Sequence, residues 1–392
     1  MNKEKVGIGV IGCGTIASVY LKNIMQHYNN LELLAVSDIY IEKAQEMAQK
    51  YGVPKACSTE ELLAMDEVEI VLNLTTPGVH YLINKKILNA GKHVYCEKPL
   101  TLSLENGKQL VNLAKQKKLL CVSAPDTFLG SGGQTVRKLL DNGVIGMPIG
   151  FTANMCCPGH ELWHPAPGFY YKEGAGPMFD MGPYYMTMLV SLLGPVKKVS
   201  AYTSSGRPIR EIQGTLVRSE VPTTYTGIME MACGAVGTVT MSFDIWNANL
   251  PCLEIYGTEG TVEVPDPNNF SGVIHVFNGN ELKSIVEETE GDHSAKLMTM
   301  IEKQTVCRKE YPLEYPADND LQCNMRGLGV SEMAQALLTQ RKARLSSELS
   351  LHVVEILNAF EISARSGEVY EMTTGCERPD PLEEGLALWE IS

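Results

Sequence analysis

A glycine-rich turn near the N-terminus constrains the fold of this chain more than any other feature. The apolar run at residues 6–11 is typical of a buried strand, and Gly12, Gly14 and a helical pattern starting at Thr15 follow it. Such a turn points the first N–H groups of the helix, at Thr15 and Ile16, toward an anion, which the helix dipole also favours. Gly12 permits the sharp turn, and Gly14 has no Cβ to obstruct a diphosphate. The segment therefore predicts a nucleotide site of the Rossmann type.

An acidic residue after the second predicted strand indicates which nucleotide is bound. Residues 31–37 read as a strand that ends at Asp38. A carboxylate about 20 to 25 residues beyond the glycines accepts hydrogen bonds from the adenosine ribose and repels a 2′-phosphate, so NAD is expected rather than NADP. The alternative is that Asp38 is the N-cap of a helix over residues 39–50. We favour the ribose role.

Length and charge limit the class of protein. The chain has 392 residues, enough for two domains, and its net charge of −13 disfavours nucleic acids and anionic membranes as partners. The first residues lead straight into the first strand, and no signal peptide or spanning segment is visible, so a cytoplasmic location is expected. The eleven cysteines are irregularly spaced, which predicts free thiols rather than disulfides.

Two secondary-structure patterns divide the chain into domains at residues 1–125 and 126–392. In the first, strands alternate with helices, which predicts a parallel, doubly wound α/β sheet. Its expected strands are residues 6–11, 31–37, 69–75, 93–96 and 119–123. The second is expected to be an α+β domain with a large, mostly antiparallel open sheet. Its expected strands are residues 149–155, 196–203, 223–232, 235–243, 252–256 and 261–264, with a hairpin turn at 257–260. Helices are expected at residues 331–341 and 349–366, and an exposed polar loop at 287–295.

Polar residues follow two of the predicted parallel strands. Thr75 ends the third strand, and Thr76, Pro77 and His80 come just after it. Because the carboxyl edge of a parallel sheet binds ligands, they are expected to contact the cofactor. Glu97 and Lys98 end the next strand, and a cation there can orient a hydroxyl or lower the pKa of a neighbouring acid. The alternative is a solvated surface pair, which this strand-end position disfavours.

A carboxylate and a phenol occur together later in the chain. Asp180 and Tyr184 are four residues apart in a glycine-led stretch that predicts a helix, so both side chains are expected on one face. Placed in this way, they can hold a hydroxyl and remove its proton. The alternative, an Asp N-cap and a Tyr packed in the core, is favoured when spacing is considered alone.

These motifs together resemble those of the Gfo/Idh/MocA oxidoreductases, which include glucose–fructose oxidoreductase and inositol dehydrogenase. The resemblance covers Gly-Cys-Gly-Thr-Ile-Ala at 12–17, Ser-Asp at 37–38, Thr-Pro-x-x-His at 76–80, Glu-Lys-Pro at 97–99, Gly-Ala-Gly-x-x-x-Asp-x-Gly at 174–182 and Tyr-Gly-Thr-Glu-Gly at 256–260. It implies a Rossmann domain, an open-sheet domain, a substrate bound between them and a homo-oligomer (dimer, tetramer or larger). It also implies catalytic roles for Lys98 and Asp180.

Two positions depart from the pattern of this family. Tyr184 stands where many members carry His, so a phenol becomes the acid/base group. A free phenol has a pKa of about 10, and an ammonium such as Lys98 beside it favours the anion. Asp126 stands in a segment where many relatives place an arginine, and we interpret it as a substrate-binding residue. The loss of that cation favours an uncharged substrate.

The segment at residues 156–165 is rich in reactive side chains. A zinc site is disfavoured there, because Pro158 and Gly159 break the helix needed to align its histidines, so no metal is expected. The resemblance places this segment at the substrate pocket, and we expect His160, Trp163 and His164 to bind substrate together with Asp180 and Tyr184. His164 is also the rival catalytic base, because an unperturbed imidazole has a pKa of about 6.5.

The combined interpretation is an NAD-dependent oxidoreductase. It would transfer a hydride between nicotinamide and a ring secondary alcohol of a sugar, glycoside or cyclitol, with C3 of a glycoside as the favoured carbon. Two alternatives stay open. One is an enzyme that recycles its NAD while it cleaves or epimerises a glycoside, and the other is a non-catalytic sensor of NAD or a sugar.

Overall fold

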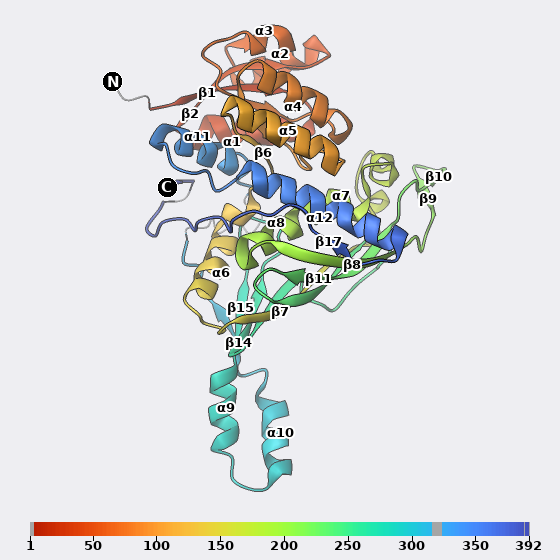
Figure 1. Ribbon diagram of the computed structural model, residues 1–392, viewed down its shortest axis with the longest axis vertical. Helices are drawn as coiled ribbons and strands as arrows, with labels where there is room; N and C mark the ends of the chain where they lie inside the picture. Colours follow the sequence, from red (N-terminus) through yellow and green to blue (C-terminus); the bar gives the residue numbers. More distant parts are fainter. Residues whose placement is uncertain (1–3, 316–323, 388, 392) are drawn as a thin grey trace.

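The computed structural model describes residues 4–315, 324–387 and 389–391, and it has two β-sheets arranged one above the other along its long axis (Figure 1). The upper sheet in this view is parallel throughout, with the strand order β3-β2-β1-β4-β5-β6. Its strands are β1 (Val6–Ile11), β2 (Leu31–Ser37), β3 (Lys55–Ala56), β4 (Ile70–Asn73), β5 (His93–Cys96) and β6 (Cys121–Ser123). The strand order reverses direction at β1 and β4, where doubly wound sheets bind ligands.

The sequence patterns anticipate this sheet well. β1, β2 and β5 have the predicted bounds, and β4 and β6 are shorter than the apolar runs that predict them. Only β3 has no predicted counterpart in the described sheet, because two residues carry no alternation that a sequence pattern can reveal. Helices cover both faces, and the buried apolar residues of this sheet fall into two separate clusters, one of which continues into the second domain. They are α1 (Thr15–His27), α2 (Ile41–Tyr51), α3 (Thr59–Leu63), α4 (His80–Asn89) and α5 (Leu104–Lys117).

The second sheet is large, mixed and mostly antiparallel, as predicted. Its described strands have the order β16-β15-β14-β13-β7-β12-β11-β8-β17, and β7 and β12 form its parallel pair. Its strands are β7 (Pro148–Cys156), β8 (Val196–Ser204), β11 (Thr224–Met231), β12 (Val236–Ser242), β13 (Leu253–Gly257), β14 (Gly260–Val264), β15 (Ile274–Asn278), β16 (Arg308–Tyr311) and β17 (Tyr370–Glu371). The predicted hairpin joins β13 to β14. A small separate ribbon holds β9 (Ile209–Ile212) and β10 (Thr215–Arg218).

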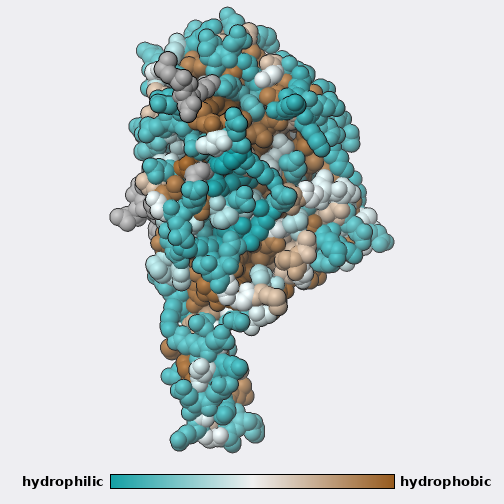
Figure 2. All heavy atoms as spheres, turned by 60° about the vertical axis from the view of Figure 1, so that its left-hand side comes forward, coloured by the Kyte–Doolittle hydropathy of each residue, from teal (hydrophilic) through white to brown (hydrophobic). Residues whose placement is uncertain are grey.

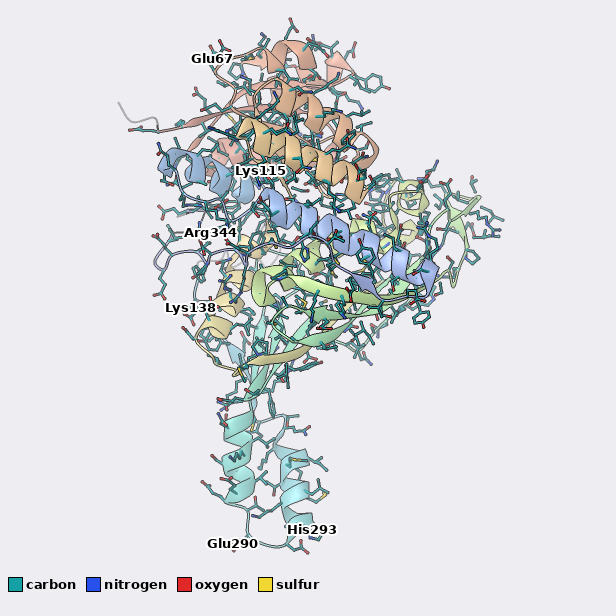
Figure 3. The ribbon with its side chains drawn as sticks, in the orientation of Figure 1. Glu67, Lys115, Lys138, Glu290, His293 and Arg344 are labelled. Atoms are coloured by element: carbon teal, nitrogen blue, oxygen red, sulfur yellow. The ribbon has the colours of Figure 1, made fainter. Side chains whose placement is uncertain are left out.

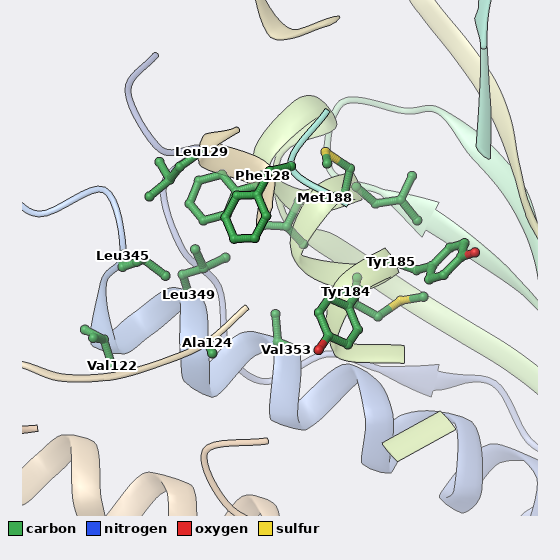
Figure 4. Packing of buried hydrophobic residues seen from close by; sticks show 14 of the residues in the cluster. Val122, Ala124, Phe128, Leu129, Tyr184, Tyr185, Met188, Leu345, Leu349 and Val353 are labelled. Carbon is green, nitrogen blue, oxygen red and sulfur yellow. The ribbon is translucent and has the colours of Figure 1, made fainter. Parts of the chain in front are cut away.

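Further helices link the two sheets or pack on the second one (Figure 1). They are α6 (Ser131–Asp141), α7 (Gly176–Asp180), α8 (Gly182–Leu193), α11 (Leu328–Thr339) and α12 (Ser347–Ser366). Figure 4 shows side chains of α8 packed against Leu349 and Val353 of α12. α12 also covers the edge of the parallel sheet, where Ser347 and Ser350 accept hydrogen bonds from the amides of Cys121 and Ser123 at 3.1 and 2.9 Å. These bonds satisfy backbone donors that an open edge strand would leave exposed.

An arm that the sequence patterns did not predict projects from the second sheet (Figures 1 and 3). The expected polar loop at residues 287–295 is wrong in part, because only residues 288–292 form a turn, and it joins two helices, α9 (Gly279–Glu287) and α10 (His293–Lys303). Neither helix has a buried residue, although apolar side chains recur at helical spacing in both, as at Leu282, Ile285 and Val286 of α9. Leu297, Met298 and Ile301 are exposed on α10, and apolar side chains are visible on the arm in Figure 2.

Two further findings concern the described residues as a whole. No helix among them is both long and apolar enough to cross a lipid bilayer. The ten cysteines among them are all free thiols, as the irregular spacing predicts.

Candidate active site

The glycine turn has the geometry that a dinucleotide pyrophosphate requires. Gly12 has a φ of +102°, and a Cβ there would lie 2.8 Å from the backbone carbonyl of Leu74. A Cβ on Gly14 would meet nothing within 4 Å, so the space over the turn is open. Gly14 is also the N-cap of α1 and offers no side-chain oxygen to the first amides of the helix, at Thr15 and Ile16. The residues present therefore fit an anion at this helix terminus.

Asp38 lies beside this turn. Its Oδ2 atom accepts a hydrogen bond from the amide of Cys13 at 2.8 Å, and its Oδ1 atom accepts one from the amide of Tyr40 at 3.0 Å. The alternative role as a helix N-cap is wrong, because α2 begins after Tyr40, which makes no side-chain cap bond. The carboxylate thus stands next to the nucleotide turn, as its position after β2 predicts.

We expect Asp38→Asn to relax the preference for NAD over NADP. Asn retains the acceptor for the Cys13 amide but removes the charge that repels a 2′-phosphate. The Kd for NADP should fall about tenfold while that for NAD rises by less than about tenfold, measured by quenching of protein fluorescence. Glu42→Gln removes an exposed acid nearby on α2 and serves as the matched control. An unchanged ratio of the two Kd values would contradict the ribose role.

A buried polar network fixes the two strand ends at the reaction site. His80 is fully buried, and its ring nitrogens lie 3.0 Å from the carbonyl oxygen of Thr75 and 2.7 Å from that of Pro99. The ring therefore lies between the turn after β4 and the turn after β5. Burial lowers the pKa of His80, which favours the neutral ring, and a neutral ring has one N–H to donate to one of these two carbonyl oxygens.

Glu97 adds a second connection behind the site. Its Oε1 atom accepts a hydrogen bond from the Tyr20 hydroxyl of α1 at 2.8 Å, and its Oε2 atom accepts one from the Lys98 amide at 3.0 Å. Both His80 and Glu97 thus bind protein groups that position Lys98. Thr76 and Pro77 lie at the start of the short 3-10 helix Pro77–Val79, at the same carboxyl edge.

Lys98 and Asp180 form a buried ion pair. The ammonium lies 2.7 Å from Oδ1 of Asp180 and 2.6 Å from its carbonyl oxygen, and both side chains are less than one-fifth exposed. Burial would raise the pKa of the Asp180 carboxyl, but Lys98 and His160 outweigh it and hold that pKa at about 2. Burial likewise opposes the charge on Lys98, yet the Asp180 carboxylate raises the pKa of the ammonium. Both groups are therefore charged at neutral pH.

Tyr184 lies beside this pair, although one helix does not carry both residues. The predicted single helix is wrong: α7 ends at Asp180, Met181 caps it, and α8 begins at Gly182. Neither helix has a side-chain N-cap, which excludes the capping alternative for Asp180. The break still leaves the Lys98 ammonium 5.3 Å from the centre of the Tyr184 ring.

Sequence patterns did not reveal a second cation next to Tyr184. Nη2 of Arg326 donates a hydrogen bond to the Tyr184 hydroxyl at 3.0 Å, across 142 residues of chain. The arginine follows no motif and precedes α11 by one glycine, so no signal in the sequence assigns it to the site.

Aromatic side chains extend the site away from Lys98. The buried His160 ring lies 3.4 Å from Oδ2 of Asp180 and stacks on Tyr170 at 4.0 Å between centroids. Trp163 packs against His160 at 5.1 Å and is 67% exposed, so its ring is open to a ligand. His164 lies on the far side of these rings from Asp180, where it contacts Trp163 and Tyr170. Its Nδ1 atom accepts a hydrogen bond from the Ala166 amide.

Asp126 lies beneath the site. It is 1% exposed, and its Oδ2 atom accepts hydrogen bonds from the amides of Gly327 and Gly329 at 3.1 and 2.9 Å. Because this carboxylate is buried, a substrate could reach it, as we expect from the sequence, only if the site opened. No group of three or more His, Cys, Asp or Glu side chains suited to a metal occurs in the described parts of the chain.

Two family models match the chain. One, described as an oxidoreductase family with an NAD-binding Rossmann fold, matches residues 6–125, and the other, the GFO/IDH/MocA C-terminal domain, matches residues 134–263. The chain belongs to the Gfo/Idh/MocA family. It is therefore an oxidoreductase whose N-terminal domain binds NAD, which agrees with the open space over Gly14 and the carboxylate of Asp38.

Relatives of this family member include enzymes that act on sugars. The D-glucoside 3-dehydrogenase of Escherichia coli is 25% identical over 316 residues, which are 76% of this chain and 87% of that protein. An uncharacterized oxidoreductase of Schizosaccharomyces pombe is 30% identical over 159 residues, but the match spans only 42% of that protein. A levoglucosan dehydrogenase, solved with NADH and levoglucosan, has a TM-score of 0.76 at 18% identity and covers 94% of this chain and 100% of that one. At that identity the match shows the fold.

Proposed function

We propose that this protein oxidises a ring secondary alcohol of a sugar, glycoside or cyclitol and passes the hydride to NAD, with C3 of a glycoside as the favoured position. The observation that carries the proposal is that Tyr184 lies beside two cations. The centre of its ring is 5.3 Å from the Lys98 ammonium, and its hydroxyl accepts a hydrogen bond from Arg326 at 3.0 Å. Lys98 follows β5, at the carboxyl edge of the same parallel sheet whose β1 leads into the nucleotide turn. The name of the E. coli relative, a D-glucoside 3-dehydrogenase, supports the substrate class.

Each side chain has a separate role in this reaction. In oxidation, Oη of Tyr184 takes the hydroxyl proton of the substrate, and in reduction it returns that proton. Lys98, held by Asp180 at 2.7 Å, orients the substrate oxygen and favours the phenolate. NAD, when bound, supplies the carbon that accepts the hydride. Trp163 offers its exposed ring to a sugar face or an aglycone, and His160 is held against Asp180.

A substrate screen with the purified protein tests this function. Any nucleotide that copurifies is identified first, and NADH formation is then followed by absorbance against sugars, glycosides and cyclitols. We expect stoichiometric NADH release with a compound that has a free ring secondary hydroxyl. Product formation without net NADH would instead support an enzyme that recycles bound NAD during cleavage or epimerisation. No change in nicotinamide absorbance across the panel would support a sensor.

We also propose a homo-oligomer in the cytoplasm. Tyr202 and Ile228 are exposed on the second sheet, at 76% and 53%, and the arm exposes Leu297, Met298 and Ile301. Exposed apolar surface of this kind marks an interface. Light scattering after gel filtration should report a multiple of the chain mass, and a monomer at micromolar concentration would contradict the proposed oligomer.

The free cysteines among the described residues support the proposed cytoplasmic location, because the cytoplasm is a reducing compartment.

A further inference from the structure

The segment before α11 reaches across from the second domain to the reaction site. Asn23 of α1 donates hydrogen bonds to the carbonyl oxygens of Asn324 and Arg326 at 2.6 and 2.9 Å. Asp126 accepts hydrogen bonds from the amides of Gly327 and Gly329, further along the same segment. Residues 324–329 are therefore held at both ends by buried polar groups of other elements. These hydrogen bonds fix the position of the Arg326 backbone, from which its side chain extends toward Tyr184.

The Arg326 guanidinium donates hydrogen bonds to uncharged groups. Nη2 donates to the Tyr184 hydroxyl at 3.0 Å and to Oδ1 of Asn268 at 3.3 Å, and Nη1 donates to Oδ1 of Asn324 at 3.0 Å. Its Cζ atom lies 6.0 Å from the centre of the Tyr184 ring. No carboxylate of a described residue lies within salt-bridge distance of it, whereas Lys98 is paired directly with Asp180. An arginine remains charged at any pH at which a protein is folded, so this charge is permanent.

The other charged and titratable groups near Tyr184 come from every element around it. They are Lys98 and Glu97 after β5, Asp180 at the end of α7, His160 and Tyr170 of the neighbouring 3-10 turns, Tyr20 of α1, and Asp126 beneath residues 324–329. The three carboxylates already have partners. Asp180 pairs with the Lys98 ammonium, and Glu97 accepts hydrogen bonds from the Tyr20 hydroxyl and the Lys98 amide. Asp126 accepts hydrogen bonds from two backbone amides. The anion that complements Arg326 most directly is then the phenolate of Tyr184 itself.

We propose that Arg326 is a catalytic residue, a second cation that contacts the acid/base oxygen of Tyr184 and stabilises its phenolate. The inference rests on the proposed function for the role of Tyr184, and it adds a residue from a different part of the chain. In oxidation, the substrate hydroxyl proton moves to the phenolate oxygen, the carbinol hydride moves to NAD, and the carbonyl forms. Arg326 exchanges no proton in this sequence; it holds the oxygen that does, and Asp126 and Asn23 act as positioning residues.

A tyrosinate titration tests this contact without any substrate. The ultraviolet absorbance of tyrosinate is followed with pH, and the titration of a Tyr184→Phe variant is subtracted to isolate Tyr184. In Arg326→Gln, the tyrosinate signal should appear at a pH higher by about one unit or more than in the wild type, because a charge at hydrogen-bond distance is lost. Arg326→Lys retains the charge and should show a smaller shift. Arg365→Gln, at the exposed end of α12, is the matched control.

Turnover supplies the second readout once a substrate is found. The rising limb of kcat/KM with pH should move to higher pH in Arg326→Gln by the same amount, and kcat at neutral pH should fall about 10-fold or more and recover at high pH. Thermal unfolding of both variants separates this effect from misfolding, and Arg326→Lys remains informative if the Gln variant unfolds. An identical tyrosinate titration in wild type and Arg326→Gln would overturn the proposal. So would a rise in KM confined to anionic substrates with an unchanged pH profile, because that result would make Arg326 a substrate anchor. If no substrate is found, the proposed function fails while the titration still decides the contact.

Discussion

Replacing Tyr184 with Phe should lower kcat by at least about 1,000-fold while leaving the Kd for NAD within about twofold of the wild type. The substitution removes only the hydroxyl, which accepts the Arg326 hydrogen bond at 3.0 Å, and leaves the buried ring in place. The nucleotide turn lies on a different element, so NAD binding is preserved. Stopped-flow measurement of NADH formation and fluorescence titration of NAD provide the two readouts.

The neighbouring Tyr185 supplies the matched control. It is equally buried in α8, but its hydroxyl points in a different direction from that of Tyr184 (Figure 4). Tyr185→Phe should therefore retain turnover. If Tyr184→Phe is as active as the wild type, the acid/base role passes to His164. A His164→Asn variant with normal activity would close that alternative.

Replacing Lys98 with Met should reduce both activity and stability. The ammonium that favours the phenolate is lost, so kcat should fall by about 100-fold or more. Asp180, about one-eighth exposed, is left without its partner 2.7 Å away, and breaking such a buried pair costs about 3 kcal/mol of unfolding free energy. Urea unfolding and initial-rate kinetics on the same preparation measure the two effects.

A double variant separates these effects of Lys98. Lys98→Met combined with Asp180→Asn removes both charges, so it should recover most of the lost stability but none of the lost activity. Lys115→Met, on the exposed face of α5, controls for loss of a lysine (Figure 3). A Lys98→Met protein as stable as the wild type would mean that Asp180 finds another partner, and His160, 3.4 Å away, is the group to test next.

Local patterns predict the nucleotide half of the site because its parts are close to strand ends. The position of Asp38 beside the Gly12 turn follows from the parallel pairing of β1 with β2, and that of Lys98 from the end of β5. Parallel strands bring their carboxyl ends to one edge, so a residue after a strand is placed in space by its place in the sequence.

The same reasoning fails where the backbone departs from a regular element. Asp180 and Tyr184 were expected to share a helix face, but the helix is interrupted at Met181. Their proximity to Lys98 therefore depends on how α7 and α8 pack. The arm was missed for a different reason. The expectation of a polar loop overlooked the apolar residues that recur at helical spacing in both arm helices, such as Leu297, Met298 and Ile301 of α10.

Arg326 shows where sequence reasoning ends for this protein. The loss of a cation at Asp126 suggested an uncharged substrate, yet the structure brings a guanidinium to the site from a distant segment. The parallel sheet, the nucleotide turn and the family follow from local patterns and motifs, because short-range geometry repeats from one α/β protein to another. The second cation beside Tyr184 does not, because its place depends on buried bonds from Asn23 and Asp126 that join segments 201 to 303 residues apart.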